Sequence, residues 1–243
     1  MSTLDRLFNE STGLADYASR YAKYLADLLA QLDCESIERV GLVFEDARRN
    51  GRMIFVIGNG GSASTASHFA NDFAFGTRKA GGKAYRMLSL TDNVAFMTAA
   101  GNDVGYDLVF VEQLKTLMNP GDVLVAISAS GNSPNVVAAV EYANNHGGIT
   151  VGLTGFDGGQ LRDLADVGVH IATPQGDYGP VEDLHLVLDH LVSSYLVRLT
   201  ASLARQEQAE RSQSPTTAQR FDRLPRTARH PQPAMLQKRA VVG

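Results

Sequence analysis

Short, almost continuous apolar runs alternate with segments of helical periodicity along most of this chain of 243 residues. The apolar runs are RMIFVIG (52–58), AYRMLSL (84–90), DVLVAIS (122–128), GITVGLTG (148–155) and DVGVHIA (166–172). Runs of this length are typical of parallel strands that are buried on both faces. The helices predicted between and after them cover 62–75, 93–100, 107–117, 133–146, 159–165 and 180–204. The pattern predicts an α/β fold with a doubly wound, five-stranded parallel sheet, in which ligands bind beyond the carboxyl ends of the strands.

Two further helices are expected before the first strand. Between residues 12 and 32, leucines and tyrosines recur at spacings of three and four, which indicates an amphipathic helix. A second helix is predicted from Glu35 to Asn50 and should end at Gly51. Together these elements fill residues 1–204, a length that suits one domain with a sizeable core.

The composition is that of an ordinary globular protein, with 44% hydrophobic and 20% charged residues. No apolar run approaches the roughly 20 residues that span a bilayer, and MSTLDRLFNEST at the start has no apolar signal core. We therefore expect a cytoplasmic protein with no membrane partner. The single cysteine, Cys34, excludes an internal disulfide and a thiolate metal cluster, and we expect it to be an idle thiol.

The charge is unevenly distributed. The formal net charge is −4, which gives no support to a nucleic-acid partner, but from Arg205 onward there are eight Lys and Arg against three Asp and Glu. This segment is rich in Gln, Arg, Pro, Ser and Thr, a composition that does not bury enough apolar surface to fold. Residues 205–243 are therefore predicted to be a disordered basic tail, which is either simply solvated or binds a partner.

The glycine-rich stretch GNGGS (58–62) follows the first predicted strand and precedes a helix. It lacks the lysine of a P-loop and the glycine spacing of a dinucleotide fingerprint, so a nucleotide is not the favoured ligand. Its backbone N–H groups at a helix N-terminus suit an anion, with Ser62 as a hydroxyl donor or as the N-cap. A purely structural turn explains the stretch equally well.

A second turn, SASGNS (128–133), follows the third predicted strand. Ser128, Ser130 and Ser133 place three hydroxyl groups around Gly131 at the start of another helix. Three hydroxyls and helix-start amides suit the three oxygens of a terminal phosphoryl group. Helix capping alone would require only one serine, Ser133, so this turn favours binding of a phosphate monoester.

Two helices carry side chains that could bind a metal or transfer protons. His68 and Asp72 are four residues apart and share a helix face, where they form a metal or acid–base pair or a surface hydrogen bond. The last predicted helix offers a larger set. Its helical positions sort this set into two stripes: Glu182, His185 and Asp189 on one, Asp183 and His190 on the other.

Several of these segments, in this order and spacing, resemble the phosphoheptose isomerases of the sugar isomerase (SIS) domain superfamily. They are GNGGSASTASHFANDF, AAGNDVGYDLVF, GDVLVAISASGNSPNVVAAVEYANNHG, TVGLTGFDGGQLRDLADVGVHIATP and VEDLHLVLDHL. The resemblance covers about residues 10–204. It implies a flavodoxin-like SIS domain with N-terminal helices, assembled as a homotetramer with active sites at subunit boundaries. It also implies an aldose–ketose isomerase that converts sedoheptulose 7-phosphate into D-glycero-D-manno-heptose 7-phosphate through a metal-assisted enediol.

The resemblance assigns roles to individual positions. The expected substrate-binding residues are Asn59, Gly60, Gly61, Ser62, Asp72, Asn102, Asp103, Ser128, Ser130, Ser133 and Glu182. The expected ligands of one zinc ion per active site are His68, Asp72, Glu182 and His190. Asp72 is further expected to act as the base, and His190 as its acid partner.

Three positions depart from the family pattern: Asp72 replaces a glutamate, Glu182 a glutamine and Ala129 a threonine. The loss of one methylene at Asp72 withdraws the carboxylate by more than about 1 Å, a misplacement that can lower a rate by about 10²-fold. Two alternatives to an active isomerase therefore stay open. One is a non-catalytic phosphosugar sensor or adaptor, and the other is an assembly factor that acts through the basic tail.

Overall fold

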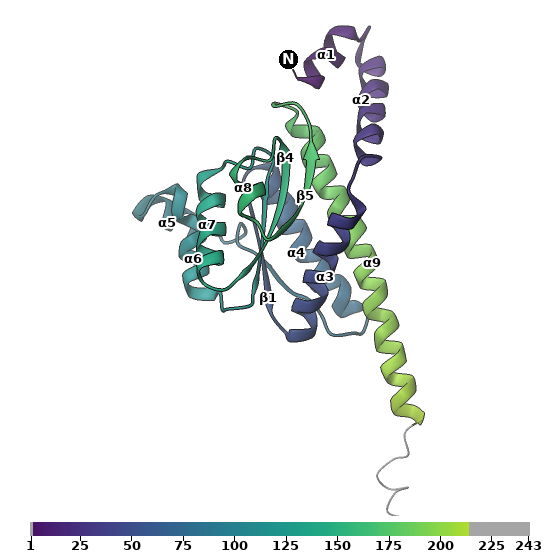
Figure 1. Ribbon diagram of the computed structural model, residues 1–243, viewed down its shortest axis with the longest axis vertical. Helices are drawn as coiled ribbons and strands as arrows, with labels where there is room; N and C mark the ends of the chain where they lie inside the picture. The colour runs from purple at the N-terminus through teal and green to yellow at the C-terminus, as the bar shows by residue number, and fades with distance from the viewer. Residues whose placement is uncertain (1, 214–243) are drawn as a thin grey trace, which may run out of the picture. The chain divides into compact units, whose positions relative to one another are not determined.

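The computed structural model describes residues 2–213, which contain one five-stranded parallel sheet (Figure 1). The strand order is β2-β1-β3-β4-β5, the doubly wound arrangement predicted from the apolar runs. All five predicted strands are confirmed, and their bounds are β1 Met53–Gly58, β2 Arg86–Ser89, β3 Val123–Ser128, β4 Ile149–Phe156 and β5 Val167–Ala172.

The helices follow the predicted order, with one addition at the start. Their bounds are α1 Thr3–Glu10, α2 Leu14–Leu29, α3 Cys34–Asn50, α4 Gly61–Lys79, α5 Val94–Asp103, α6 Val109–Leu117, α7 Pro134–Asn145, α8 Gly159–Leu164 and α9 Tyr178–Gln213. A short 3₁₀ helix, Tyr106–Leu108, precedes α6. Helix α1 was not predicted, and it begins at a capping box between Ser2 and Asp5. Helix α3 ends as expected at Gly51, which has the left-handed φ of 69° that favours glycine.

The sheet separates two layers of helices. On one side α3, α4 and α9 cover Ile54 and Val56 of β1, and on the other α6, α7 and α8 cover Phe55 and Ile57. The four β1 side chains are at most 1% exposed, because successive residues of a strand point to opposite faces and both faces are covered. The sheet is thus buried in the way that its uninterrupted apolar runs indicate.

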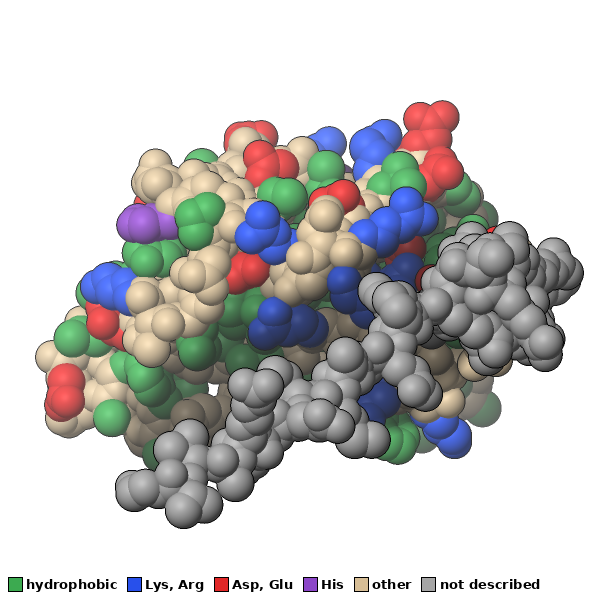
Figure 2. Space-filling model, turned by 90° about the horizontal axis from the view of Figure 1, so that it is seen from below, with side chains coloured by type: hydrophobic (Ala, Val, Ile, Leu, Met, Phe, Trp, Pro, Cys, Tyr) green, Lys and Arg blue, Asp and Glu red, His purple; other side chains and the backbone are tan. Residues whose placement is uncertain are grey.

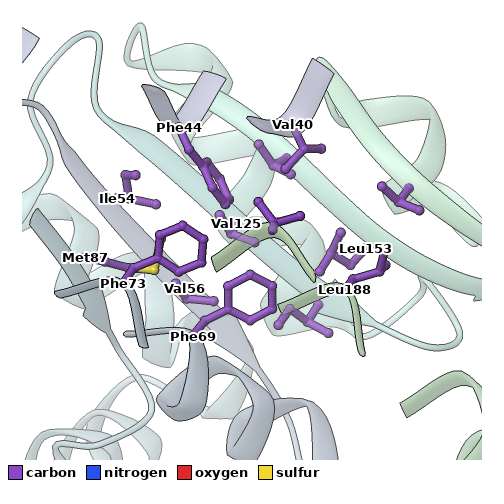
Figure 3. Close-up of a cluster of buried hydrophobic side chains, with 14 of the residues drawn as sticks. Val40, Phe44, Ile54, Val56, Phe69, Phe73, Met87, Val125, Leu153 and Leu188 are labelled. Carbon is purple, nitrogen blue, oxygen red and sulfur yellow. The ribbon is translucent and has the colours of Figure 1, made fainter. Parts of the chain in front are cut away.

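Aromatic packing fixes α4 against the sheet and its neighbouring helices (Figure 3). Phe73 of α4 stands edge-on to Phe44 of α3 with ring centroids 5.4 Å apart, and Phe69 stacks against Phe73. Leu188 of α9 joins the same buried cluster. Because His68 precedes Phe69 and Asp189 follows Leu188, this cluster determines where the polar residues of α4 and α9 lie.

Helices α4 and α9 run in the same direction and touch at several points. A methyl group at Gly61 would lie 2.2 Å from Glu182 Oε2, and one at Gly76 would lie 3.3 Å from Val197 Cγ2. Between these two contacts, His68 meets His190. The offset between partners, close to 121 residues throughout, shows that the two helices advance in parallel, and small residues on α4 allow their close approach.

The N-terminal helices are attached to the chain just before α9. The backbone N–H groups of Thr3 and Leu4 each donate to the carboxylate of Asp177 at 3.3 Å, and the hydroxyl of Tyr24 in α2 donates to it at 2.9 Å. Asp177 is fully buried. One carboxylate therefore fastens both α1 and α2.

The predicted tail overlaps the end of α9. The residues Met1–Ala204 form one compact unit. Residues 205–213 continue α9 as a helix, so disorder was the wrong prediction for them. The rest of the predicted tail, 214–243, lies outside the described residues.

Where Figure 2 shows described residues, Lys and Arg side chains alternate with Asp, Glu and hydrophobic ones.

Helix α9 is unusually long and apolar. Within the described residues, the segment Tyr178–Glu210 is the one helix whose length and composition would allow it to cross a membrane. Four of its apolar side chains are buried in the core next to α3 and α4: Leu184, Leu188, Val192 and Leu196. Core helices of globular proteins commonly meet the same criterion, so the apolar face of α9 is accounted for by packing.

Candidate functional site

The glycine-rich turn after β1 and the serine-rich turn after β3 lie side by side, because β1 and β3 are neighbours in the sheet. After β1 the chain adds β2 on one side of β1 and then crosses to add β3 on the other side. The gap between β1 and β3 is therefore the switch point at which doubly wound folds bind ligands. Asn59 and Asn135 connect the two turns through a pair of amide hydrogen bonds of 2.8 and 2.9 Å. Tyr106 also donates to Asn59 Oδ1 at 2.8 Å.

The serine turn keeps its hydroxyl groups together. Ser128 Oγ lies 3.3 Å from Ser133 Oγ and accepts a hydrogen bond of 3.1 Å from the N–H of Gly131. Ser133 is the N-cap residue of α7, yet in the described structure its hydroxyl makes no capping hydrogen bond. The capping explanation for this turn therefore fails, and the hydroxyl of Ser133 instead faces Ser128.

The turn that precedes α8 packs directly against the serine turn. Gly131 has a φ of +65°, and a Cβ there would lie 1.8 Å from the carbonyl oxygen of Gly158. The N–H of Leu161 in α8 donates to the carbonyl of Gly131 at 2.9 Å. Only glycine allows this close approach of two backbones.

Ser130 faces a small cavity of about 210 Å³. The cavity is lined by Ser130, Asn132, Phe156, Asp157, Thr173 and Gln175. The hydroxyl of Thr173 is one of the few buried side-chain polar groups among the described residues without a hydrogen-bond partner. Thr173 falls within the segment 150–174 that carries the family resemblance, but it follows the last strand singly and the sequence assigned it no role.

The glycine turn differs from its prediction in one respect. Helix α4 begins at Gly61 with Gly60 as N-cap, so Ser62 is not the N-cap but a buried residue of the first helical turn. The carboxylate of Glu182 lies directly against Gly61. Burial, followed by the nearby charge of Asp183, raises the pKa of Glu182.

Asn102 and Asp103 lie at the end of α5. Asn102 Nδ2 donates to Asp103 Oδ1 at 2.7 Å, and both side chains are exposed. Tyr106, which bonds Asn59, is the residue that links this segment to the glycine turn. The structure thus brings the segment next to the two turns through a residue that the sequence motifs did not single out.

A second polar group forms where α4 meets α9. His68 Nε2 lies 3.1 Å from His190 Nε2 and 3.5 Å from Asp72 Oδ2. With Asp189, these residues offer ligand atoms that all lie within 4.8 Å of one another. His68 and His190 are exposed, Asp72 is half-buried and Asp189 is fully buried. Three of the four predicted metal ligands are therefore brought together.

The distances in this group fit a metal better than they fit hydrogen bonds. Two ligands at 2.0–2.1 Å from a tetrahedral zinc ion are about 3.3 Å apart, close to the 3.1 and 3.5 Å found here. As a hydrogen bond, 3.5 Å is long. Both oxygens of Asp189 are buried and lack a hydrogen-bond partner within the described structure, which is the environment that a cation would complete. The residues present therefore fit a divalent metal ion.

Glu182, the fourth predicted ligand, lies outside this group. It precedes His190 by eight residues, about 12 Å along a helix, and its carboxylate contacts the start of α4 instead. The physical reason is that α4 and α9 advance in parallel, so each residue of α9 meets α4 at its own level. Asp189 lies at the same position along the helix axes as His68, so it joins the group. The helical positions in the sequence had placed Asp189 and His190 on different faces of the helix.

Burial perturbs two further groups on α9. Burial, and then the charge of Asp72, raises the pKa of Asp189 to about 8. Burial lowers the pKa of His185, one turn earlier, to about 4, so this imidazole is neutral at pH 7. His185 therefore behaves as a buried core residue, whereas Glu182 is half-buried and His190 is exposed on the same helix.

The polar group opens into a groove between α4 and α9. The groove has a volume of about 390 Å³, and Asp72 and His190 contribute to its wall. Its other lining residues are Asn71, Phe75, Gly76, Ser193, Ser194, Val197 and Arg198. Solvent or a ligand can thus reach the exposed side of the polar group.

Comparison with known proteins supports the assignment of this fold. Residues 16–155 match the family model of the SIS domain. The chain is 37% identical over 158 residues to a protein named phosphoheptose isomerase from Aliarcobacter butzleri, covering 65% of this chain and 82% of the relative. It is 42% identical over 146 residues to a protein of the same name from Geobacter metallireducens, covering 60% and 76%.

Solved structures of the same name are also similar. The phosphoheptose isomerase from Neisseria gonorrhoeae has a TM-score of 0.63 at 32% identity, over 73% of this chain and 96% of that one. The one from Francisella tularensis has a TM-score of 0.67 at 25% identity, over 82% and 100%. On the fold, the match to the domain model and these identities, the chain belongs to the SIS domain family and, within it, to the phosphoheptose isomerases.

Proposed function

We propose that this chain is an aldose–ketose isomerase that converts sedoheptulose 7-phosphate into D-glycero-D-manno-heptose 7-phosphate. The observation that carries the proposal is the meeting of His68 and Asp72 with Asp189 and His190, which gives a phosphoheptose isomerase fold a metal-capable, proton-transferring group. A protein that only bound the sugar phosphate would have no need of this group.

The serine turn would hold the phosphate. Ser128, Ser130 and Ser133 supply hydroxyls, and α7 begins at this point with its positive dipole end. Asn59, clamped by Asn135 and Tyr106, and the carboxylate of Glu182 would contact the sugar hydroxyls. Gly61 and His68 are seven residues apart, about 10 Å along α4, so a chain-like sugar phosphate could reach from the turns to the polar group.

The reaction moves a proton between two adjacent carbons of the sugar through an enediol. In this proposal Asp72 removes the proton beside the carbonyl, since its carboxylate is half-buried and borders the groove. His190 returns a proton. The Nε2 of His190 is directed at His68, so Nδ1 is the nitrogen left free to carry the proton that His190 would return.

We further propose zinc as the metal, one ion per active site, held by His68, Asp72 and His190. Two imidazole nitrogens with carboxylate oxygens are a donor set that zinc accepts. When bound, the ion supplies a positive charge that polarises the substrate carbonyl. The glycine-rich and serine-rich turns would orient the substrate.

The proposal includes a cytoplasmic homotetramer with active sites at subunit boundaries. Helix α5 supports an assembly: it is mostly apolar, yet within the described structure none of its residues is buried, and Val94 is 69% exposed. Residues 1–204 would form the catalytic domain and 205–243 an appended basic segment. Light scattering on the full chain after size-exclusion chromatography tests the tetramer, and the mass of a monomer would contradict it.

A turnover assay with sedoheptulose 7-phosphate, run beside metal analysis of the same purified protein, tests the function. We expect stoichiometric zinc and formation of the heptose 7-phosphate aldose, both lost together on treatment with a chelator and restored by Zn²⁺. Tight binding of the sugar phosphate without turnover would contradict the isomerase and indicate a sensor or adaptor.

A further inference from the structure

The hydroxyl group of Tyr106 binds the glycine-rich turn, although Tyr106 lies at the surface. Tyr106 begins the short 3₁₀ helix Tyr106–Leu108 and is 57% exposed. Water could satisfy a hydroxyl group at this exposure, yet the hydroxyl donates to Asn59 Oδ1 at 2.8 Å, across 47 positions of the chain. A surface tyrosine for which no role was predicted therefore contacts a predicted substrate-binding residue.

The hydrogen bonds of Asn59 leave one N–H for a ligand. Its Oδ1 accepts from Tyr106 and, at 2.9 Å, from Nδ2 of Asn135, which together use both acceptor positions of an amide oxygen. Its Nδ2 donates one hydrogen to Asn135 Oδ1 at 2.8 Å. The second hydrogen on Nδ2 has no acceptor within the described structure. The amide of Asn59 is thus set to donate a hydrogen bond, which fits an oxygen atom of a sugar phosphate.

The two partners of Asn59 come from different surroundings. Asn135 is 1% exposed and lies in the first turn of α7, so the core holds it in place. Tyr106 follows α5, a helix that has no buried residue within the described structure. In the part of the chain that the structure describes, the Tyr106 hydroxyl makes the one hydrogen bond that joins the segment 94–108 to the glycine-rich turn. All these contacts form within one chain, so each subunit of an assembly would contain them.

We propose that Tyr106 is a positioning residue for substrate binding, whose hydroxyl group holds the Asn59 amide so that its remaining N–H donates to an oxygen of the bound sugar phosphate. The proposal rests on the function proposed above, because it concerns the same site. The same hydrogen bond holds Asn102 and Asp103, which end α5, beside the glycine-rich turn. One hydroxyl group would therefore align two sets of predicted substrate contacts without touching the substrate.

A double-mutant cycle tests whether Tyr106 acts through Asn59. The Kd for sedoheptulose 7-phosphate is measured by equilibrium dialysis on the full chain for the wild type, Tyr106→Phe, Asn59→Ala and the double variant. We expect the Kd to rise about 3- to 10-fold in Tyr106→Phe, the effect of one hydrogen bond, and about 10- to 100-fold in Asn59→Ala. The double variant should have the Kd of Asn59→Ala, because the hydroxyl then has no amide to position. An unchanged Kd in Tyr106→Phe, or two effects that multiply in the double variant, would overturn the proposal.

The melting temperature and the kinetics separate positioning from a structural role. Tyr106→Phe should keep the wild-type Tm, because the ring is retained and the lost hydroxyl group is at the surface. Its KM should rise by the same factor as its Kd while kcat is kept, since Asn59 lies at the two turns and not in the polar group between α4 and α9. A lower Tm, or a loss confined to kcat, would overturn the proposal.

The matched control is Tyr142→Phe on α7. The hydroxyl group of Tyr142 makes no hydrogen bond within the described structure, and its ring stacks on His146. The Kd, KM and Tm of this variant should equal those of the wild type. A wild type that binds sedoheptulose 7-phosphate without turnover would refute the isomerase, and the Kd values of the cycle would still decide the role of Tyr106.

Discussion

The Nε2 atoms of His68 and His190 lie 3.1 Å apart, although the two residues are separated by 122 positions in the chain. Their rings meet edge-on, with centroids 4.9 Å apart. Two imidazole nitrogens at this distance either share one proton or point at one metal ion. The parallel packing of α4 and α9 produces this contact, so the site depends on how two helices that lie far apart in the chain are held together.

Removal of one imidazole should abolish metal binding. For His190→Ala we expect the Kd for Zn²⁺ to rise by more than about 100-fold, because a direct ligand matters more than its supporting groups. Isomerase activity should fall to background. The matched control is His146→Ala, an exposed histidine at the end of α7, for which both the metal content and the activity should equal those of the wild type.

Asp72 should act mainly on the chemical step. Asp72→Asn keeps the shape of the side chain but removes the base, so at Zn²⁺ concentrations that keep the variant loaded kcat should fall by about 10²-fold or more while KM changes little. Steady-state kinetics with sedoheptulose 7-phosphate provides the measurement. Asp163→Asn, an exposed carboxylate on α8, serves as control, and a loss confined to KM in Asp72→Asn would refute the role of base.

The serine turn should act on binding. Ser130→Ala removes one hydroxyl that would face the phosphate, and a hydrogen bond to a charged group contributes about 1.5–3 kcal/mol, so kcat/KM should fall by roughly 10- to 100-fold. The loss should be smaller for a substrate analogue without the phosphate. Ser19→Ala on the exposed face of α2 should leave the kinetics unchanged; equal losses with and without the phosphate would argue against the cradle.

The amide pair that connects the two turns should contribute to stability. Asn135 is 1% exposed, and Asn135→Ala removes the acceptor that lies 2.8 Å from Asn59 Nδ2, while Tyr106 still donates to Asn59 Oδ1. We expect a loss of about 1–3 kcal/mol in the free energy of unfolding, measured with urea, together with a higher KM. Asn145→Ala, at the exposed end of the same helix, should change neither quantity.

Acid should weaken one buried ion pair away from the site. Burial raises the pKa of Glu45, but hydrogen bonds from Arg48, Tyr85 and Arg49 outweigh it and lower the pKa to about 2. A carboxyl group with a lowered pKa stabilises the folded state above its unfolded pKa, and this contribution is lost as the pH falls toward 2. The difference in unfolding free energy between wild type and Glu45→Gln should therefore shrink from pH 5 downward.

The control for this prediction is Glu112→Gln, which removes a carboxylate that pairs with Lys115 at the surface of α6. Exposed pairs contribute little, so its unfolding free energy should match that of the wild type at every pH. A constant difference for Glu45→Gln across the same range would contradict the assigned pKa.

The sequence by itself determined the five strands, their alternation with helices, and the positions of the glycine-rich and serine-rich turns. Buried parallel strands require uninterrupted apolar runs, and turns such as 58–62 and 128–133 require glycine and serine, so these features are written locally. The identity of His68, Asp72 and His190 as one group also followed from the resemblance. In each case, a few neighbouring residues or a linear motif carry the information.

Only the tertiary structure decided which residues of α9 meet which residues of α4. A helical wheel placed Asp189 and His190 on different stripes, but two adjacent side chains 100° apart can both reach a group that lies between them. The same packing moved Glu182 away to Gly61. Asn135 meets Asn59 only because β1 and β3 are neighbours in the sheet. Thr173 likewise lies in the same cavity wall as Ser130 only in the folded chain. Contacts of this kind depend on the level at which two helices pack, and that level is fixed by the shared hydrophobic core around Phe69 and Leu188.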